Sequence, residues 1–249
     1  GAAAGLRWNL GLFRADNRDD ILFVADDAAG FGYFKNFGKT RRQGLEAGIS
    51  TPLAALGGAT VGANVTWLDA TFRSAEVVGG AGNSSNAEAE AGFPGVQGTI
   101  AVRPGDRIPL VPRQLLKLFA ELPLGSQFSI GADVTAVGGA DARGNENNAH
   151  APDGTYYLGA GRSAGYAVFN LNGEWRPARG LTVFMQVNNL FNRHYNTAAQ
   201  LAATAFDANS NFQARPFPAN ANGDRPLVGS TFYAPGAPRS VYFGLRYTL

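Results

Sequence analysis

Histidine and cysteine carry much of enzyme and metal chemistry, and this sequence has few of either. It contains two histidines, His150 and His194, and no cysteine. A hydrolase requires a nucleophile, a base and an orienting group within hydrogen-bonding distance. His150 lies beside Asp153 in a loop of Asn and Ala, where we expect a solvated histidine, and His194 lies in an Asn-Arg-His-Tyr segment at a strand end. We predict that the chain is not an enzyme, and a hydrolase using one of these histidines stays open as an alternative.

Metal, phosphate and nucleic-acid chemistry find equally little support in the sequence. Two distant histidines without cysteine do not make a metal-ligand cluster. The glycine-rich stretch 159–165 lacks the spacing and the following helix of a phosphate-binding loop. A net charge of +2 is too small to indicate nucleic acid as a partner. We expect no cofactor, no metal ion and no nucleic-acid partner.

Segments that alternate between apolar and polar residues run through the whole chain. A period of two is the signal of a β-strand with one buried or lipid-facing side. Near the end of the chain, Val241, Phe243 and Leu245 alternate with Tyr242 and Gly244. Eight such strands are predicted, at about residues 6–21, 33–53, 59–72, 112–122, 127–137, 165–176, 181–195 and 237–249.

The connections between these strands alternate in length. Short turns are expected at 54–58, 123–126 and 177–180, and long connections at 73–110, 138–164 and 192–235. Short turns on one rim and long loops on the other are typical of outer-membrane barrels. Charged residues make up 16% of the chain, and no stretch offers the roughly 20 apolar residues of a membrane helix. The predicted fold class is therefore all-β, an antiparallel transmembrane β-barrel.

Aromatic residues gather near the predicted strand ends. Trp and Phe at both membrane interfaces form the girdles of such barrels, and an ordinary sandwich core is the alternative explanation. The residues that we expect in the girdles are Trp8, Trp67, Phe72, Trp175, Phe191 and Tyr195.

Several stretches also resemble a known family. They are 36–46 (Asn-Phe-Gly-Lys-Thr-Arg-Arg-Gln-Gly-Leu-Glu), 67–72, 108–113, 187–195 (Val-Asn-Asn-Leu-Phe-Asn-Arg-His-Tyr) and 233–239. Their order and spacing resemble the C-terminal part of the β-barrel of TonB-dependent outer-membrane receptors of the siderophore receptor type. The family barrel has 22 strands, so the resemblance implies that residues 1–249 form about eight of them. It also implies short periplasmic turns, long extracellular loops and an N-terminal plug domain that this chain lacks.

The resemblance implies a function as well. Members of the family actively transport a ferric siderophore or a similar scarce nutrient across the bacterial cell outer membrane. Expected partners are that ligand, outer-membrane lipid, the barrel assembly machinery, and the TonB complex through the missing plug region. The terminal assembly signal of the family is matched by Gly244, Tyr247 and Leu249, although its members usually end in an aromatic residue.

Loop residues are the candidates for ligand binding. Cationic and aromatic side chains suit an anionic, aromatic iron chelate through charge and stacking. The candidates of these types are Arg143, His150, Tyr156, Tyr157, Arg162 and Arg215. Solubility of the loops explains any single one of them better than ligand binding does.

A free-standing small outer-membrane barrel is the alternative to a receptor. Eight-stranded barrels exist, and such a barrel would act as a passive pore or a surface protein. It would have to close on itself, because hydrocarbon does not tolerate an open sheet edge.

Overall fold

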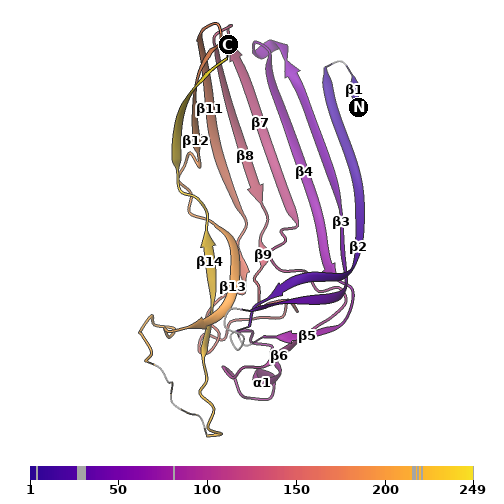
Figure 1. Ribbon diagram of the computed structural model, residues 1–249, viewed down its shortest axis with the longest axis vertical. Helices are drawn as coiled ribbons and strands as arrows, with labels where there is room; N and C mark the ends of the chain where they lie inside the picture. Colours follow the sequence, from indigo (N-terminus) through magenta and orange to yellow (C-terminus); the bar gives the residue numbers. More distant parts are fainter. Residues whose placement is uncertain are drawn as a thin grey trace.

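One large antiparallel sheet forms a curved wall of long strands (Figure 1). The computed structural model describes residues 1–3, 5–26, 32–80, 82–214, 217, 219 and 221–248. The strand order in the sheet is β1-β2-β3-β4-β7-β8-β11-β12-β15. These strands are β1 (Ala2–Ala3), β2 (Leu6–Val24), β3 (Tyr33–Leu53), β4 (Ala59–Phe72), β7 (Gln114–Leu124), β8 (Phe128–Val137), β11 (Tyr166–Ala178), β12 (Leu181–Asn188) and β15 (Ser240–Tyr247). Since β1 has only two residues, eight long strands form the wall, which confirms the predicted all-β class.

The predicted strand boundaries differ from the observed ones mainly at the loop end of the wall. The strands predicted at 33–53 and 59–72 match β3 and β4, whereas β2 continues past 21 to Val24. The strand predicted at 181–195 ends at Asn188, and the last strand begins at Ser240. These two predictions were wrong at the loop end, because a tight turn, described below, follows β12.

Strand register places the apolar residues of all eight long strands on one side of the wall. Leu12 lies opposite Leu45, which lies opposite Trp67. At the other end of the sheet, Met185 lies opposite Phe243. The outermost of these side chains are largely exposed: Leu12 is 78% exposed and Phe243 is 74% exposed. A continuous exposed apolar face on a sheet of this size is a surface for lipid.

Most of the predicted girdle residues are exposed near the ends of this wall. Trp8, Trp67, Trp175 and Phe191 are each more than two-fifths exposed. Trp175 stacks on Phe128 beside a short turn, with ring centroids 6.0 Å apart. The prediction for Phe72 was wrong, because this ring is completely buried.

The opposite side of the wall is polar and includes aromatic rings that lie over glycines. Phe119 lies opposite Gly62, and Phe184 lies opposite Gly244. A Cβ atom on Gly62 would lie 2.3 Å from the Phe119 ring, and one on Gly244 would lie 2.2 Å from the Phe184 ring. Only glycine allows the ring of the neighbouring strand to lie flat across the backbone at these positions.

The described strands do not close into a barrel. Within the described part of the chain, β15 pairs in the sheet only with β12, and β2 pairs with β3 and with the two residues of β1. The closed eight-stranded barrel required by the small-barrel alternative is therefore not formed by these strands. Open edges leave backbone groups without partners, which hydrocarbon does not tolerate.

The long connections contain secondary structure that the sequence did not predict. The first holds β5 (Glu76–Gly79), α1 (Ala87–Glu90) and β6 (Thr99–Val102); the second holds β9 (Ala140–Asp141) and β10 (Arg162–Ser163); the third holds β13 (Asn196–Thr204) and β14 (Val228–Pro235). They gather at one end of the wall, and the short turns, one of which contains the 3-10 turn Ala54–Leu56, lie at the other (Figure 1). Among the described residues, no helix has both the length and the apolar character needed to cross a membrane.

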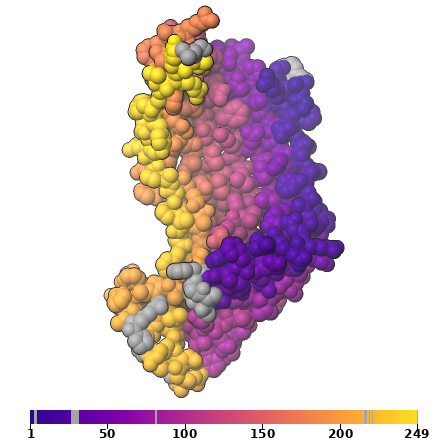
Figure 2. All heavy atoms as spheres, in the orientation of Figure 1, coloured from indigo at the N-terminus to yellow at the C-terminus, as the bar shows by residue number. Residues whose placement is uncertain are grey.

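A bend in the β2–β3 hairpin brings its end to these connections. Asp19 has a φ of 53°, yet pairing continues in the same register, with Arg18 opposite Lys39 and Asp20 opposite Phe37. The hairpin therefore turns without slipping, and its end lies across the front of the wall (Figure 2). We use the name loop cap for this hairpin end beyond Asp19 together with the three long connections, as far as they are described.

The largest buried apolar cluster of the described residues lies in the loop cap. Side chains from the hairpin end, from β4, from the β5–β6 hairpin and from the segment after it pack together. Its buried members are Val24, Phe37, Ala70, Phe72, Val78, Ile100, Val102 and Ile108. The wall faces solvent or lipid on both sides, so this cluster is the apolar core that holds the hairpin end, the end of β4 and the first long connection together.

Candidate functional site

Two asparagine-rich loops lock together at the centre of the loop cap. The Asn83 side-chain amide donates to the Gly144 carbonyl oxygen at 2.8 Å and to Asn147 Oδ1 at 3.1 Å. Asn86 donates to the Asn83 carbonyl oxygen at 2.8 Å and accepts from the Ala89 N–H, which caps α1. Both asparagines are completely buried. Because buried polar groups are costly unless they are paired, these bonds fix one loop against the other.

His150 is part of this packing. Its Nε2 lies 2.9 Å from the Gly159 carbonyl oxygen, and its Nδ1 accepts from the Ser84 N–H at 3.2 Å. A carbonyl oxygen only accepts, so the proton is assigned to Nε2 and the ring is neutral. Burial lowers the pKa of His150, although the Gly159 hydrogen bond opposes this effect. The expectation of a solvated histidine was wrong, and neither ring nitrogen is free to act as a general base.

Tyr157 and Tyr156 follow a turn that is organised by Asp153. One carboxylate oxygen of Asp153 accepts from the N–H groups of Thr155, Tyr156 and Tyr157, each at 2.8 Å. Partial burial would raise the pKa of Asp153, but these hydrogen bonds outweigh it and hold the pKa below its usual range. The Tyr157 ring is 2% exposed, and its hydroxyl oxygen accepts from the Gly95 N–H at 3.1 Å. Tyr156 is half-buried.

Glu146 is a carboxyl group in the interior of the loop cap. It is 2% exposed, and its Oε1 accepts from the Gly144 N–H at 2.9 Å. Its Oε2 finds no hydrogen-bond partner among the described residues. Burial raises the pKa of Glu146 to about 7, against the opposing effects of the Gly144 hydrogen bond and of the Arg143 charge. This carboxyl therefore titrates near neutral pH.

Arg143 lines a groove beside β13. Its N–H donates to the Ala199 carbonyl oxygen at 3.0 Å, so its segment runs along the edge of that strand. Its guanidinium carbon lies 4.9 Å from the centroid of the Phe23 ring. The groove has a volume of about 520 Å³ and is lined by Arg143, Gln200, Phe232, Tyr233, Leu110 and several alanines. A cleft of this size with a cation and two aromatic rings can hold a small anionic, aromatic molecule.

The other candidates are placed differently. Arg162 is exposed on β10, which pairs with β9. Arg215 lies outside the described residues, as does Leu249 of the terminal signal. The structure thus brings His150, Tyr156 and Tyr157 into one packed region, and it places Arg143 alone of the described candidates in the wall of the groove. In the described part of the chain, no three His, Asp or Glu side chains gather as a metal site.

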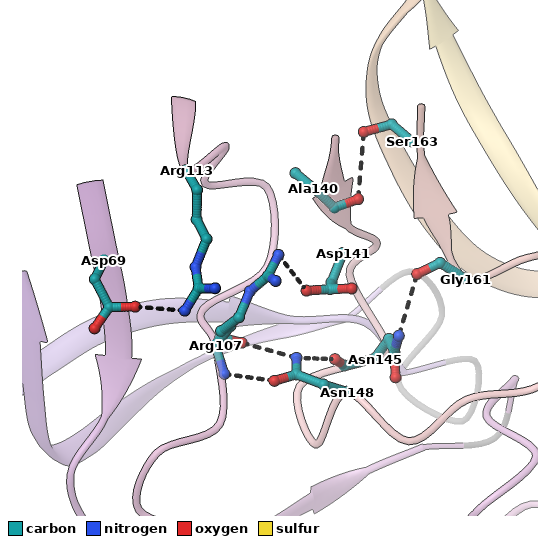
Figure 3. A network of polar contacts seen from close by, with 9 residues as sticks. All are labelled: Asp69, Arg107, Arg113, Ala140, Asp141, Asn145, Asn148, Gly161 and Ser163. Atoms are coloured by element: carbon teal, nitrogen blue, oxygen red, sulfur yellow. Dashed lines mark hydrogen bonds and ion pairs between the residues drawn. The ribbon is translucent and has the colours of Figure 1, made fainter. Parts of the chain in front are cut away.

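A polar network ties the loop cap to the wall (Figure 3). Arg113, just before β7, pairs with Asp69 of β4 at 2.9 Å, and Arg107 pairs with Asp141 of β9 at 3.0 Å. The Asn148 side chain accepts from the Arg107 N–H and donates to the Arg107 carbonyl oxygen. The second long connection is thereby fixed to the segment that leads into β7.

The sequence analysis missed the asparagines and Glu146, because it chose loop candidates only among cationic and aromatic side chains. A signal was present in the runs Gly-Asn-Ser-Ser-Asn at 82–86 and Gly-Asn-Glu-Asn-Asn at 144–148. Several short amide side chains close together can form hydrogen bonds with the backbone groups that a loop leaves unpaired. Two runs of this kind in different loops indicate mutual contact.

Asn189 holds the tight turn that follows β12. Asn189 and Asn192 have φ values of 49° and 50°. The Asn189 amide donates to the carbonyl oxygens of Arg193 at 2.9 Å and Ala237 at 3.0 Å, and its Oδ1 accepts from the Arg193 N–H at 2.8 Å. It is 4% exposed. The stretch 187–195, on which the resemblance depends most, is therefore the end of a strand followed by a tight turn. The Asn189 side chain in this turn is hydrogen-bonded to the segment that leads into the last strand.

Asn189→Ala should open this turn. Three hydrogen bonds are lost and two part-buried carbonyl oxygens lose a donor, so we expect local stability to fall by about 2–3 kcal/mol. Asn189→Asp keeps the acceptor but places a carboxylate oxygen against both carbonyl oxygens, so its effect should be at least as large. Hydrogen exchange over 189–195 in the assembled protein measures both, with the exposed Asn209→Ala as control. Equal exchange in all variants would show that the Asn189 hydrogen bonds do not hold this turn.

The wall and the loop cap have the sequence features of a known family. Residues 2–190 match the family model described as TonB dependent receptor-like, beta-barrel. The chain belongs to this family. TonB-dependent receptors are transporters of the outer membrane of Gram-negative bacteria, not enzymes. The receptor chain is therefore an outer-membrane protein, its short turns face the periplasm, and the loop cap is extracellular.

Solved structures of the family share the fold of this receptor chain. The ferric yersiniabactin uptake receptor FyuA from Yersinia pestis matches with a TM-score of 0.58 at 15% identity, covering 99% of this chain and 28% of that one. The siderophore receptor PiuA from Acinetobacter baumannii matches with 0.57 at 12% identity, covering 98% and 26%. The copper transporter OprC matches with 0.57 at 18% identity, covering 98% and 29%. The chain thus spans less than a third of the length of these receptors.

Proposed function

We propose that this chain is the C-terminal part of the barrel of a TonB-dependent receptor that imports a scarce nutrient, of the type of a ferric siderophore. The observation that carries the proposal is the extracellular groove lined by Arg143, Phe232 and Tyr233 in a chain of this family. An arginine and aromatic rings attract an anionic, aromatic chelate through charge and stacking. Solved relatives described as siderophore receptors support this class of ligand.

The proposal extends to the rest of the receptor. Fourteen further strands and a plug domain would close the wall into the 22-stranded barrel of the family, and the open edges of β2 and β15 fit this arrangement. The plug region would contact the TonB complex. The barrel assembly machinery would recognise the last strand through Gly244, Tyr247 and Leu249. His150, Tyr156, Tyr157, Arg162 and Arg215 remain predicted ligand contacts, of which His150 and Tyr157 would have to move.

Deletion of the receptor gene tests the function. We expect the deletion strain to lose energised uptake of one chelate from a panel of radiolabelled ferric siderophores and copper chelates, and the intact gene to restore it. Unchanged uptake of every chelate in the panel would remove the transport proposal.

Arg143→Ala tests the groove. Loss of one charge-assisted contact of about 1.5–3 kcal/mol should weaken binding of the imported chelate roughly ten- to hundredfold, while the receptor remains at normal levels in the outer membrane. The control is Arg179→Ala, which changes an exposed arginine in a periplasmic turn. If binding to the Arg143 variant equals that of the control, the groove is not the binding site, whatever the deletion shows.

A further inference from the structure

One short segment joins the buried Glu146 carboxyl to the groove that Arg143 lines. The Arg143 N–H donates to the Ala199 carbonyl oxygen at 3.0 Å, and the Arg143 carbonyl oxygen accepts from the Leu201 N–H at 2.8 Å, so the segment runs along β13. Ala199 also lines the groove. A Cβ atom on the next residue, Gly144, would lie 2.9 Å from Leu201 Cβ, and the Gly144 N–H donates to Glu146 Oε1 at 2.9 Å. The carboxyl and the groove therefore share one edge of β13.

Neither Arg143 nor Glu146 forms an ion pair with the described residues. The guanidinium carbon of Arg143 lies 4.9 Å from the centroid of the Phe23 ring, and Glu146 Oε2 has no hydrogen-bond partner in the described part of the chain. Burial raises the pKa of Glu146 to about 7, while backbone hydrogen bonds and the Arg143 charge act to lower it. Because an electrostatic interaction is mutual, an ionised Glu146 reduces the positive potential at Arg143.

Arg143 is the charged neighbour that acts on Glu146. Residues 142–148 contact β13, the loop 82–86, the segment 157–161 and the hairpin end beyond Asp19. β13 and the loop 82–86 contain no titratable side chain. The described titratable groups of the other segments and of the rest of this connection are Asp20, Asp26, Tyr33, Lys35, Asp141, His150, Asp153, Tyr157 and Arg162. After burial and the backbone hydrogen bonds, the charge that acts on the pKa of Glu146 is that of Arg143. A second charge bound beside Arg143 would therefore act on Glu146 as well.

We propose that an anionic aromatic molecule bound in the groove promotes proton uptake by Glu146, so that this carboxyl regulates the affinity of the groove. The proton passes from solvent to Oε2, the carboxylate oxygen without a partner among the described residues. The groove supplies the cation and the aromatic rings that hold the anion, and Glu146 supplies the group whose charge opposes it. The inference rests on the groove as the binding site and thus on the proposed function.

Linkage gives the sign and the size of the effect. An anion beside Arg143 repels an ionised Glu146, so the pKa of this carboxyl is higher in the complex than the value of about 7 in the free protein. Affinity is then complete below about pH 7 and is lost as the pH rises from there to the pKa of the complex. Two unit charges about 10 Å apart, at an effective dielectric constant of about 20–40, alter each other's equilibria by roughly four- to fifteenfold.

The test uses the intact receptor that contains this chain, purified in detergent, with 1-naphthoate as the probe, an aromatic carboxylate that stays ionised between pH 6 and pH 8.5. We expect its affinity to fall about fourfold or more over this range. Calorimetry at pH 7.5 in buffers of different ionisation enthalpy should detect roughly half a proton taken up per bound naphthoate. Glu146→Gln should keep the pH 6 affinity at pH 8.5 and take up no proton. Glu90→Gln, which changes an exposed carboxyl of α1, should behave like the unaltered receptor.

Two further measurements show whether the link depends on charge in the groove. Arg143→Ala should weaken naphthoate binding at pH 6 roughly ten- to hundredfold, which places the probe at Arg143. 1-Naphthamide has the same rings without the charge, and it should bind the unaltered receptor equally at pH 6 and pH 8.5. A pH dependence shared by both probes would come from loosening of the loop cap instead.

The proposal is overturned by equal naphthoate affinity at pH 6 and pH 8.5, by an unchanged pH dependence in Glu146→Gln, by the same pH dependence with 1-naphthamide, or by binding that Arg143→Ala does not weaken. If Glu146→Gln does not assemble, the infrared carbonyl band of protonated carboxyl groups decides. Naphthoate should increase this band in the unaltered receptor at pH 7.5, and an unchanged band would overturn the proposal. Loss of chelate uptake in the deletion strain together with pH-independent naphthoate binding would overturn the proton link and support the proposed function.

Discussion

Phe72→Ala is expected to unfold the loop cap locally while the wall stays intact. The Phe72 ring is fully buried and lies 4.9 Å from the Phe37 ring, centroid to centroid, in the apolar cluster. Truncation of a buried phenylalanine costs about 3–5 kcal/mol through lost contacts and the cavity that remains. Backbone amides of β5 and β6 in the intact receptor should therefore exchange with solvent a hundredfold to several thousandfold faster.

The matched control for this experiment is Phe212→Ala, because Phe212 lies in the third long connection and is 69% exposed. It should leave exchange in β5 and β6 unchanged. If Phe72→Ala and Phe212→Ala behave alike, the cluster does not hold the loop cap together.

Stability of the loop cap should fall as pH rises from about 4.5 to 7. Glu146 has its pKa raised to about 7 by burial, from an ordinary value of 4.5. A carboxyl whose pKa is higher in the folded state favours folding in its protonated form, so its contribution is complete below pH 4.5. The contribution is lost between about pH 4.5 and 7, and the loss amounts to about 3 kcal/mol. Protection factors of amides in 142–147 should therefore drop roughly a hundredfold between pH 5 and pH 8.

Glu146→Gln isolates this effect. The glutamine oxygen can still accept from the Gly144 N–H, and the side chain carries no charge at any pH. Protection factors over 142–147 should then be the same at pH 5 and pH 8. A wild-type receptor whose protection does not change over this range, or a Gln variant that keeps the wild-type pH dependence, would exclude Glu146 as the cause.

The strands of the wall could be predicted from sequence because the pattern that specifies them lies within each strand. Lipid on one side and a polar interior on the other impose alternation on each strand separately. Leu45 is followed by Glu46, and Trp67 is preceded by Thr66. Such alternation assigns each residue to the lipid-facing or the polar side of the sheet without knowledge of the neighbouring strands. The short turns follow from the same alternation, because they are the places where it stops.

The loop cap could not be predicted in this way. Asn83 and Asn145 are residues of types that usually lie in solvent, and their burial depends on a partner loop more than 60 residues away. Phe72 ends an alternating strand and was expected at the interface. Its burial results from the bend at Asp19, which carries Val24 and Phe37 to it. Such contacts depend on how loops meet, and no periodic pattern encodes that.

The candidate ligand residues were chosen by chemical type, and type alone does not distinguish a groove from a packed interior. Arg143 lines the groove because its segment runs beside β13, a strand that the alternation did not reveal. His150 and Tyr157 share the chemistry of ligand contacts but complete the asparagine network.

The unbroken register of two strand pairs in the wall also limits how such a protein can change its length during evolution. β4 pairs with β3 from Ala59 to Phe72, and β12 pairs with β15 from Leu181 to Asn188, without a shift. One residue inserted before Asn64 would turn Asn64 and Thr66 toward lipid and Val65 toward the interior. Insertions and deletions are therefore tolerated in the extracellular connections and excluded from the strands. Solved structures at 12–18% identity can for this reason share the fold of this wall.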